Sequence, residues 1–496
     1  MPEIICKVND AVNGIVWGRF GIALLLIAGI IMTAVNRGFQ FTHFAYWMKH
    51  TIGAIFVDKH ITAHTGKSSK SISQFQSLCT AMAATIGTGN IVGVATAILL
   101  GGPGAIFWMW IMALFGMMTN YSENVLGIYF RRKGSKGEWR GGAMYYIRDG
   151  LGSYRGMKRI GTVLAALFSI FCLLASFGIG NMSQVNSIAG NMESAFSIPT
   201  WITGGVLVII AAVVILGGLK RVATVAEKLV PFMAVLYIFG AFIIIIAHVQ
   251  NVPTVFASIF KGAFAAKAAG GGIVGAGIQQ AITWGFKRGA FSNEAGLGSS
   301  VMVHSSSNVT EPVQQGMWGI FEVFADTLIV CTLTALAVLS SGIVNLETGA
   351  VISQNAGASL VGEAFGTVFG GWGGKFIAIA ILLFAFSTVL GWSHYGATAW
   401  QYLFGERTQV VYQLCFIAMI FFGSTMNLSL AWDLSDTFNG LMMIPNLIGL
   451  ISLSPLIHRI TKNYIDRVML GKDTESMKSA FDEAGFCRNK AGQQAS

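Results

Sequence analysis

The chain has 496 residues, of which 54% are hydrophobic and only 11% are charged, and its mean hydropathy is +0.64. Soluble globular domains carry about 25% charged residues, so the composition excludes a soluble protein and indicates an integral membrane protein. The net charge of +10 does not indicate nucleic-acid binding, because Lys and Arg gather in alternate gaps between apolar segments. The amino-terminal segment lacks the basic start of a cleavable signal peptide, so we expect the first apolar run to remain as a helix.

Eleven apolar segments are long enough to cross a bilayer, for which a helix needs about 20 residues. In chain order they are 14–35, 74–100, 104–130, 160–187, 200–217, 222–248, 272–302, 315–341, 374–403, 409–425 and 428–453. The first is an additional helix, and the other ten are numbered helices 1 to 10. They form two groups of five, and an odd number of spans inverts the second group relative to the first. The sequence therefore predicts an all-α integral membrane protein with eleven transmembrane helices: one extra N-terminal helix and two inverted five-helix repeats.

The predicted organisation divides the chain into five parts. They are an extra helix at 1–36, a cytoplasmic loop with an interfacial helix (40–57) at 37–73, a first repeat at 74–250, a second repeat at 251–455 and a cytoplasmic tail at 456–496. Of the 32 Lys and Arg residues, 25 lie in one set of alternate gaps and in the tail. Because cytoplasmic loops are enriched in Lys and Arg, we predict an outside N-terminus and a cytoplasmic C-terminus.

Helix 1 contains the stretch TIGTGNIVGVA at 85–95, in which Gly87, Gly89 and Asn90 interrupt an apolar run. Helix 6 is also rich in glycine, and the two helices stand first in their groups of five. Glycine-interrupted spans at matching places in two inverted halves are the sequence sign of a transport site near the middle of the bilayer. The alternative is close helix packing through the pair Gly89 and Gly93, but Asn90 and the second interrupted helix favour a binding site.

A broken helix in lipid exposes backbone groups that have no water partner, so the break is stable only where it lines a protein cavity. Free amides at the start of the second half attract a carboxylate. Free carbonyls at the end of the first half coordinate a hard cation such as Na⁺. The amides would come from Thr88, Gly89 and Asn90, and the carbonyls from Ala83, Thr85 and Ile86.

Helix 3 carries three neutral hydrogen-bonding side chains in the stretch SFGIGNMSQVNSIAG, namely Asn181, Gln184 and Asn186. Asn181 and Gln184 share a helix face, because they are three residues apart. Gln184 is a candidate partner for a bound polar solute. The alternative is that these amides join helices or lie at the membrane surface, and both interpretations stay open.

Helix 6 ends in FKRGAFSNEAGLGSS, which places Lys287, Arg288 and Glu294 at membrane depth. Charged groups at this depth are costly unless they are paired or hydrated. We interpret them first as an internal ion pair or an inner gate and second as direct substrate ligands. Trp284 and Phe286 are candidates for aromatic walls of a pocket.

Helix 8 reads IAIAILLFAFSTVLGWSHYGATAW and carries adjacent hydroxyls at Ser387 and Thr388. Together with carbonyls of a neighbouring break they would form an oxygen cage suited to Na⁺. The alternative is that each hydroxyl bonds back to its own helix, as Ser and Thr commonly do. Trp392 follows one turn later on the face of Thr388, where it would wall a pocket or fill the core.

Three long stretches resemble the alanine or glycine:cation symporter family of prokaryotes: GTGNIVGVATAILLGGPGAIFWMWIMALFGMMTNYSEN, YFRRKGSKGEWRGGAMYYI and FKRGAFSNEAGLGSS. The resemblance covers about residues 14–455. That family is similar in fold to the bacterial leucine transporter type. The resemblance implies sodium-coupled uptake of alanine or glycine across the plasma (inner) membrane by alternating access, with Na⁺ as the coupling ion and no cofactor.

The resemblance also implies site residues on this chain. The substrate ligands would be Thr88, Gly89, Asn90, Gln184, Trp392 and a break in helix 6 at Gly285 and Phe286, while the Na⁺ ligands would be Ala83, Ile86, Ser387 and Thr388. The expected partners are the amino acid, Na⁺ and membrane lipid, with no nucleic acid. Alanine against glycine, the D- against the L-isomer, Na⁺ against H⁺ and the oligomeric state are left open.

Two other classes of protein fit the sequence less well. A channel would need a continuous polar pore, whereas this chain has isolated polar clusters and bulky aromatic residues. An enzyme would need a nucleophile with a base or a metal cluster at depth, and no two histidines have ligand spacing within a span. The six dispersed cysteines are interpreted as small packing residues; they are Cys6, Cys79, Cys172, Cys331, Cys415 and Cys487.

Overall fold

The computed structural model describes residues 2–66, 71–134, 137–264, 276–426 and 429–481. The predicted first residues of helix 6 (272–275), the end of the tail (482–496) and Cys487 lie outside the described residues. The described chain is mostly helical, as predicted. Two short strands, β1 (Arg132–Lys133) and β2 (Trp139–Arg140), pair as a small antiparallel hairpin.

The helical elements are labelled in chain order, with η for short 3-10 or π-helical segments. In the first half they are α1 (Pro2–Val16), α2 (Arg19–Val35), α3 (Phe39–Thr42), α4 (Phe44–His50), α5 (Ile52–Val57), α6 (Lys59–Thr62), α7 (Gln74–Thr85), η1 (Gly89–Gly93), α8 (Val94–Gly101), α9 (Gly104–Phe130), α10 (Ala143–Asp149), η2 (Leu151–Ser153), α11 (Lys158–Phe177), η3 (Gly178–Met182), α12 (Ser183–Phe196), α13 (Thr200–Ile215) and α14 (Gly218–Ala247). In the second half they are η4 (Val249–Asn251), α15 (Val252–Phe264), α16 (Ala276–Asn293), α17 (Val301–His304), α18 (Pro312–Val323), η5 (Phe324–Cys331), α19 (Thr332–Ser340), α20 (Gly357–Phe369), α21 (Trp372–Phe404), η6 (Glu406–Thr408), α22 (Gln409–Thr425), α23 (Ser429–Ser452), α24 (Ser454–Tyr464) and η7 (Ile465–Met469).

Six helices of the described chain are long and apolar enough to cross a membrane, and up to eight spans result if each of two bent pairs is one span. The six are Cys6–Val35, Lys158–Phe196, Gly218–Ala247, Pro312–Ser340, Trp372–Phe404 and Glu406–Thr425. The bent pairs are Gln74–Thr85 with Gly89–Gly101, at 50°, and Asp433–Ser452 with Ser454–Met469, at 60°. These helices support a multi-pass membrane protein, while the count of eleven and the inverted repeats stay predictions.

The outer surface of the bundle is apolar over long stretches of helix. On α13 and α14 the exposed fractions of Ile209, Phe232, Val235 and Phe239 range from 61% to 67%, and Leu414 of α22 is 55% exposed. Whole helix faces of such residues would aggregate in water, whereas lipid solvates them. These faces therefore support contact with lipid.

Two predicted elements at the amino-terminal end differ in the structure. The extra helix was expected at 14–35, but α1 already begins at Pro2 and meets α2 at a bend after Val16. The predicted interfacial helix at 40–57 was wrong as one helix, because His43 and Thr51 leave helical geometry and divide it into α3, α4 and α5. Trp47 of α4 is fully buried, so part of this segment packs against the bundle.

Helix 6 is interrupted at a different place from the one expected. The predicted break at Gly285 and Phe286 was wrong, since α16 runs without interruption from Ala276 to Asn293. The chain unwinds immediately afterwards, where Glu294 has a φ of 56° and Gly296 a φ of 89°. These left-handed conformations end the helix, and α17 begins only at Val301.

Three π-helical segments interrupt the long helices: η1 follows the break in helix 1, η3 joins α11 to α12, and η5 joins α18 to α19. A π-helical turn carries one residue more than an α-helical turn and often marks a functional site. η1 contacts η5 directly. The widened turns therefore bring irregular backbone of two different helices together in the interior.

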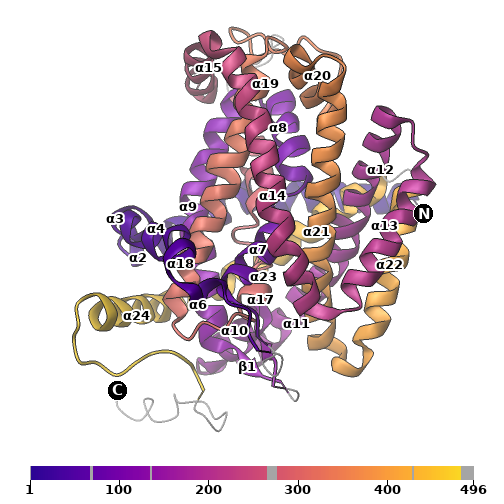
Figure 1. Ribbon diagram of the computed structural model, residues 1–496. Coiled ribbons are helices and arrows are strands. Elements are labelled where there is room, and N and C mark those ends of the chain that lie inside the picture. Colours follow the sequence, from indigo (N-terminus) through magenta and orange to yellow (C-terminus); the bar gives the residue numbers. More distant parts are fainter. Residues whose placement is uncertain (1, 67–70, 135–136, 265–275, 427–428, 482–496) are drawn as a thin grey trace.

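The two ends of the bundle carry different connections. The loop before α11 lies at the end of the bundle that holds β1 and α10, and the loop before α20 lies at the opposite end (Figure 1).

We expect Arg155→Cys and Gln354→Cys, in a background without the native cysteines, to react with a membrane-impermeant thiol reagent from opposite sides of the membrane. Gln354→Cys should react in intact cells and Arg155→Cys only after permeabilisation. Labelling of both from one side would contradict this arrangement.

Candidate binding site at the broken helix

The predicted break in helix 1 is confirmed. α7 ends at Thr85, Ile86 adopts an extended conformation with a ψ of 91°, and the chain resumes as η1 at Gly89. The Ile86 amide still bonds to the Met82 carbonyl at 2.8 Å, which closes the first half. The Gly87 amide has no helical partner and donates instead to the Asn90 side-chain oxygen at 3.0 Å. Asn90 thus caps the break from within the same helix.

The predicted ligands Thr88 and Gln184 lie side by side. The Thr88 amide donates to Oε1 of Gln184 over 3.4 Å, which is a long and weak hydrogen bond. The Thr88 hydroxyl is buried and has no hydrogen-bond partner in the structure. Such groups are rarely left unsatisfied in proteins. A ligand oxygen placed here would satisfy both the amide and the hydroxyl of Thr88.

Three of the predicted cation ligands, Ala83, Ser387 and Thr388, also lie at the break. The Ser387 hydroxyl lies 3.2 Å from the Ala83 carbonyl, and it also donates to Phe384 O at 2.8 Å. Thr388 donates to the same Phe384 carbonyl at 3.0 Å. Both hydroxyls therefore bond back to their own helix, which was the alternative interpretation, and they nevertheless face the end of α7. A Cβ added at Gly87 would collide with Oγ1 of Thr388.

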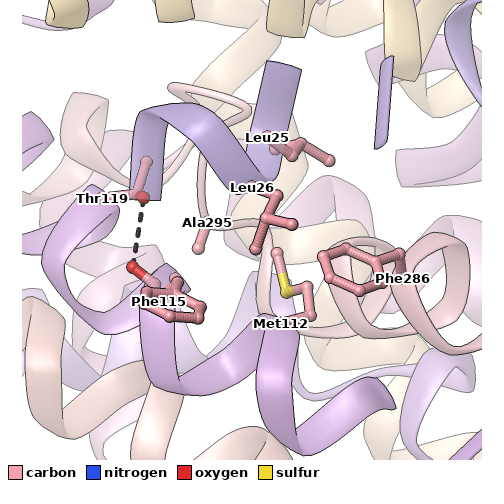
Figure 2. A pocket seen from close by; sticks show the side chains of 8 residues that line it. Leu25, Leu26, Met112, Phe115, Thr119, Phe286 and Ala295 are labelled. Atoms are coloured by element: carbon pink, nitrogen blue, oxygen red, sulfur yellow. Dashed lines mark hydrogen bonds between the residues drawn. The ribbon is translucent and has the colours of Figure 1, made fainter. Parts of the chain in front are cut away.

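Gly285 and Phe286 lie away from the break. A Cβ at Gly285 would lie 2.5 Å from the Ala105 carbonyl of α9, so this glycine allows two helices to approach. Phe286 lines a small apolar cavity with Leu25, Met112 and neighbouring residues (Figure 2). The residues of α16 that contact Gly89 are instead Phe291 and Ser292, each with an atom 3.2 Å from a Cβ placed there.

Trp392 contacts the unwound segment after α16. Its indole N–H donates to Glu294 at 2.8 Å, and Ser299 donates to the other carboxylate oxygen at 2.5 Å. Glu294 is therefore not the partner of Lys287 or Arg288. Lys287 pairs with Asp436 of α23 at 2.5 Å, so the predicted ion pair exists with a different acid. The Arg288 guanidinium lies over the rings of Trp284 and Phe291.

The two asparagines of helix 3 join helices. Asn181 donates to the Phe416 carbonyl at 2.7 Å, and Asn186 donates to the carbonyls of Gly423 and Met426 at 3.1 and 3.0 Å. All three carbonyls belong to α22 or to the residue that follows it. This was the alternative interpretation for these residues, and Gln184 is the one that reaches the break.

Asp326 was missed in the sequence. It is fully buried in η5, and the Asn90 side-chain amide donates to its Oδ1 at 2.6 Å. Ser292 and Thr327 donate to its Oδ2 at 2.8 Å each. The available signal was an ionisable residue in an apolar span, which marks a functional site by default.

A helix that breaks in the interior, faced by polar groups of other helices within a bundle of membrane-capable spans, is an arrangement typical of secondary transporters. The fold is similar to that of MhsT, whose structure in complex with L-phenylalanine gives a TM-score of 0.50. The match covers 79% of this chain and 99% of that chain at 15% identity, so it concerns the fold alone.

The chain belongs to the sodium:alanine symporter family, whose model matches residues 2–478. It is 42% identical to the sodium/alanine symporter AgcS of Methanococcus maripaludis, over 93% of this chain and 97% of that protein. It is 37% identical to the "Probable sodium/glutamine symporter GlnT" of Bacillus subtilis, over 95% of this chain and 93% of that protein. The chain is thus a multi-pass plasma-membrane transporter and not an enzyme, and the resemblance seen in the sequence is confirmed.

Substitution of Gly87 and of Gly93 by alanine should change the stability of the protein in different ways. Gly87→Ala should lower the free energy of unfolding by about 1–3 kcal/mol, because its Cβ would collide with the Thr388 hydroxyl. Gly93→Ala should be neutral or stabilise by about 0.4–1 kcal/mol, since the nearest atom lies 3.9 Å from its Cβ. Thermal unfolding of the purified variants in detergent measures both. Equal melting temperatures for the two variants would show that Gly87 and Thr388 are not in close contact.

Proposed function

We propose that this transporter couples the inward movement of a small neutral amino acid, alanine or glycine, to the inward movement of Na⁺ by alternating access. One observation carries the proposal: at the break in helix 1 the buried Thr88 hydroxyl has no partner and the Thr88 amide makes only a long bond to Gln184, while the Ala83 carbonyl lies near Ser387. A carboxylate bound at Thr88 and a cation bound near Ala83 would lie close together. Each would then favour the binding of the other.

The amino-acid carboxylate would bind the amides of Thr88, Gly89 and Asn90, with Gln184 beside them. Partial positive charge at the start of the second half-helix favours this anion. Phe291 packs against Gly89 and restricts the room beside the amides, which favours a small side chain. One of the two relatives is named for alanine and the other for glutamine, so membership of the family does not by itself determine the substrate. Trp392 would influence substrate binding indirectly, because its indole N–H bonds to Glu294 in the unwound segment after α16.

Na⁺ would bind between the end of α7 and α21. The proposed ligands are the carbonyls of Ala83 and Ile86 and the hydroxyls of Ser387 and Thr388. All are oxygen atoms, as a hard cation requires, and the hydroxyls would turn their hydrogens away from the ion toward Phe384 O, as they already do. No further cofactor is proposed. Proton coupling in place of Na⁺ is the alternative that the experiments below distinguish.

The proposed orientation places the gap at 131–159 and the tail in the cytoplasm and the N-terminus outside. In this orientation the repeats 74–250 and 251–455 would rock around the break during transport. The proposed location is the inner membrane of a prokaryote.

Equilibrium binding of alanine and of glycine to the purified transporter tests the function. We expect Na⁺ to tighten binding by about 5–150-fold relative to choline, and alanine to tighten Na⁺ binding by the same factor, because coupling is reciprocal. Equal affinity in Na⁺ and choline would contradict sodium coupling.

Gly89→Val should weaken alanine binding strongly, because its branched side chain would crowd Phe291 and Ser292 beside the amides.

The ion site makes a separate prediction. Thr388→Ala should raise the Na⁺ concentration needed for half-maximal alanine binding, because it removes one proposed oxygen ligand. Thr162→Ala is the matched control, since its hydroxyl makes the same kind of bond to its own helix, 2.9 Å from the Lys158 carbonyl, on the exposed face of α11. The control should keep wild-type Na⁺ dependence. If Thr388→Ala also keeps it, the hydroxyl is structural and the proposed ion site is wrong.

A further inference from the structure

Asp326 is joined directly to the broken helix through one side chain. Asn90 accepts from the Gly87 amide with its side-chain oxygen, so its amide nitrogen must point the other way, to Oδ1 of Asp326 at 2.6 Å. The order of atoms in Asn90 is thereby determined by the backbone of the break. Oδ1 of Asp326 must act as an acceptor in every charge state.

The second carboxylate oxygen faces groups that can reverse their hydrogen bonds. Ser292 and Thr327 each place a hydroxyl 2.8 Å from Oδ2. A hydroxyl donates to a charged carboxylate but accepts from a protonated one. Ser292 has a second partner, Sγ of Cys331 at 3.2 Å, to which its hydrogen can turn when Oδ2 carries a proton. The cluster therefore accommodates the charged and the neutral acid without movement of heavy atoms.

Asp326 has no cationic partner in the part of the chain that the structure describes. No Lys, Arg or His of those residues forms an ion pair with it, and its three side-chain donors are neutral. An unpaired buried charge at membrane depth is costly and commonly marks a proton or ion path. η5 packs against α9, α16, α18, α19 and η1, and its Phe324 also contacts Phe44 and Trp47 of α4. The titratable residues of these elements are Tyr121, Glu123 and Tyr129 of α9, Lys287 and Arg288 of α16, Glu322 of α18, and Tyr46, Lys49 and His50 of α4. Glu294 lies just beyond α16, and Cys331 lies within η5.

We propose that Asp326 is a proton-binding site of this transporter and that its protonation favours binding of the amino acid at the break. The proposal rests on the proposed function, because it takes the amides of Thr88, Gly89 and Asn90 as the carboxylate site. Protonation at Oδ2 removes a negative charge behind Asn90, next to the position of the substrate carboxylate. The proton and the amino acid therefore bind cooperatively, and binding of the amino acid draws a proton onto Asp326.

The test measures protons taken up when alanine binds to the purified transporter in weakly buffered detergent solution, between pH 5 and 8, in Na⁺ and in choline. We expect the wild type to take up a fraction of one proton per alanine, and its alanine affinity to fall at least about 5-fold across the range as the pH rises. Asp326→Asn resembles the neutral acid, because its oxygen accepts from Asn90 and its amide donates to the two hydroxyls. It should take up no proton and bind alanine with little dependence on pH. Asp473→Asn, an exposed acid of the tail, should behave as the wild type.

The outcomes separate this proposal from the proposed function. Sodium-dependent alanine binding by the wild type without proton uptake at any pH would overturn the proton site alone, and this result needs no variant to fold. Proton uptake that persists in Asp326→Asn would assign the proton to another group and overturn the proposal. If the wild type takes up no proton and Asp326→Asn loses the effect of Na⁺, the site holds Na⁺ instead. Failure of alanine to bind in either salt would overturn the proposed function and this inference with it.

Discussion

The whole site depends on one constraint: backbone groups freed by the break in helix 1 have no water to bond to and must find other partners within the protein. The Gly87 amide donates to Asn90 and the Thr88 amide to Gln184 of α12, and the Ala83 carbonyl lies 3.2 Å from the Ser387 hydroxyl of α21. Asn90 in turn binds Asp326 of η5. The break therefore contacts three parts of the chain that are distant in sequence, namely α12, α21 and η5. A ligand that replaces one of these partners changes the balance of all of them, which is the physical basis for coupling.

Helix α21 connects the two irregular regions of the protein. Ser387 and Thr388 face the break in helix 1, and Trp392, one turn later, holds Glu294 in the unwound segment after α16. A movement of α21 relative to either break must disturb bonds at both. The contact of Gly89 with Phe291 and Ser292 adds a direct connection between the two interrupted helices. Substrate, ion and proton would thus act on one connected set of contacts, and no long-range pathway is required.

The sequence was sufficient where local chemistry decides the structure. The helix 1 break followed from two glycines and Asn90 within an apolar span, and the Ser387–Thr388 pair followed from adjacent hydroxyls. The helix 6 break was misplaced because its glycines look alike in the sequence, and packing decides that Gly285 serves a helix contact whereas Gly296 adopts a positive φ. Asp326 was missed because its span stays apolar enough to cross a membrane in spite of the acid, and its partner Asn90 lies 236 residues away. Long-range partners of this kind cannot be read from one sequence.

The most direct measurement of the central claim is uptake of radiolabelled alanine and glycine by proteoliposomes that contain the purified protein. With Na⁺ imposed outside and choline inside, we predict accumulation of at least one of the two amino acids above its external concentration, followed by decline as the Na⁺ gradient dissipates. Choline on both sides should give no accumulation. Equal accumulation with and without the Na⁺ gradient, or simple equilibration in both cases, would contradict a sodium-coupled transporter built around the broken helix.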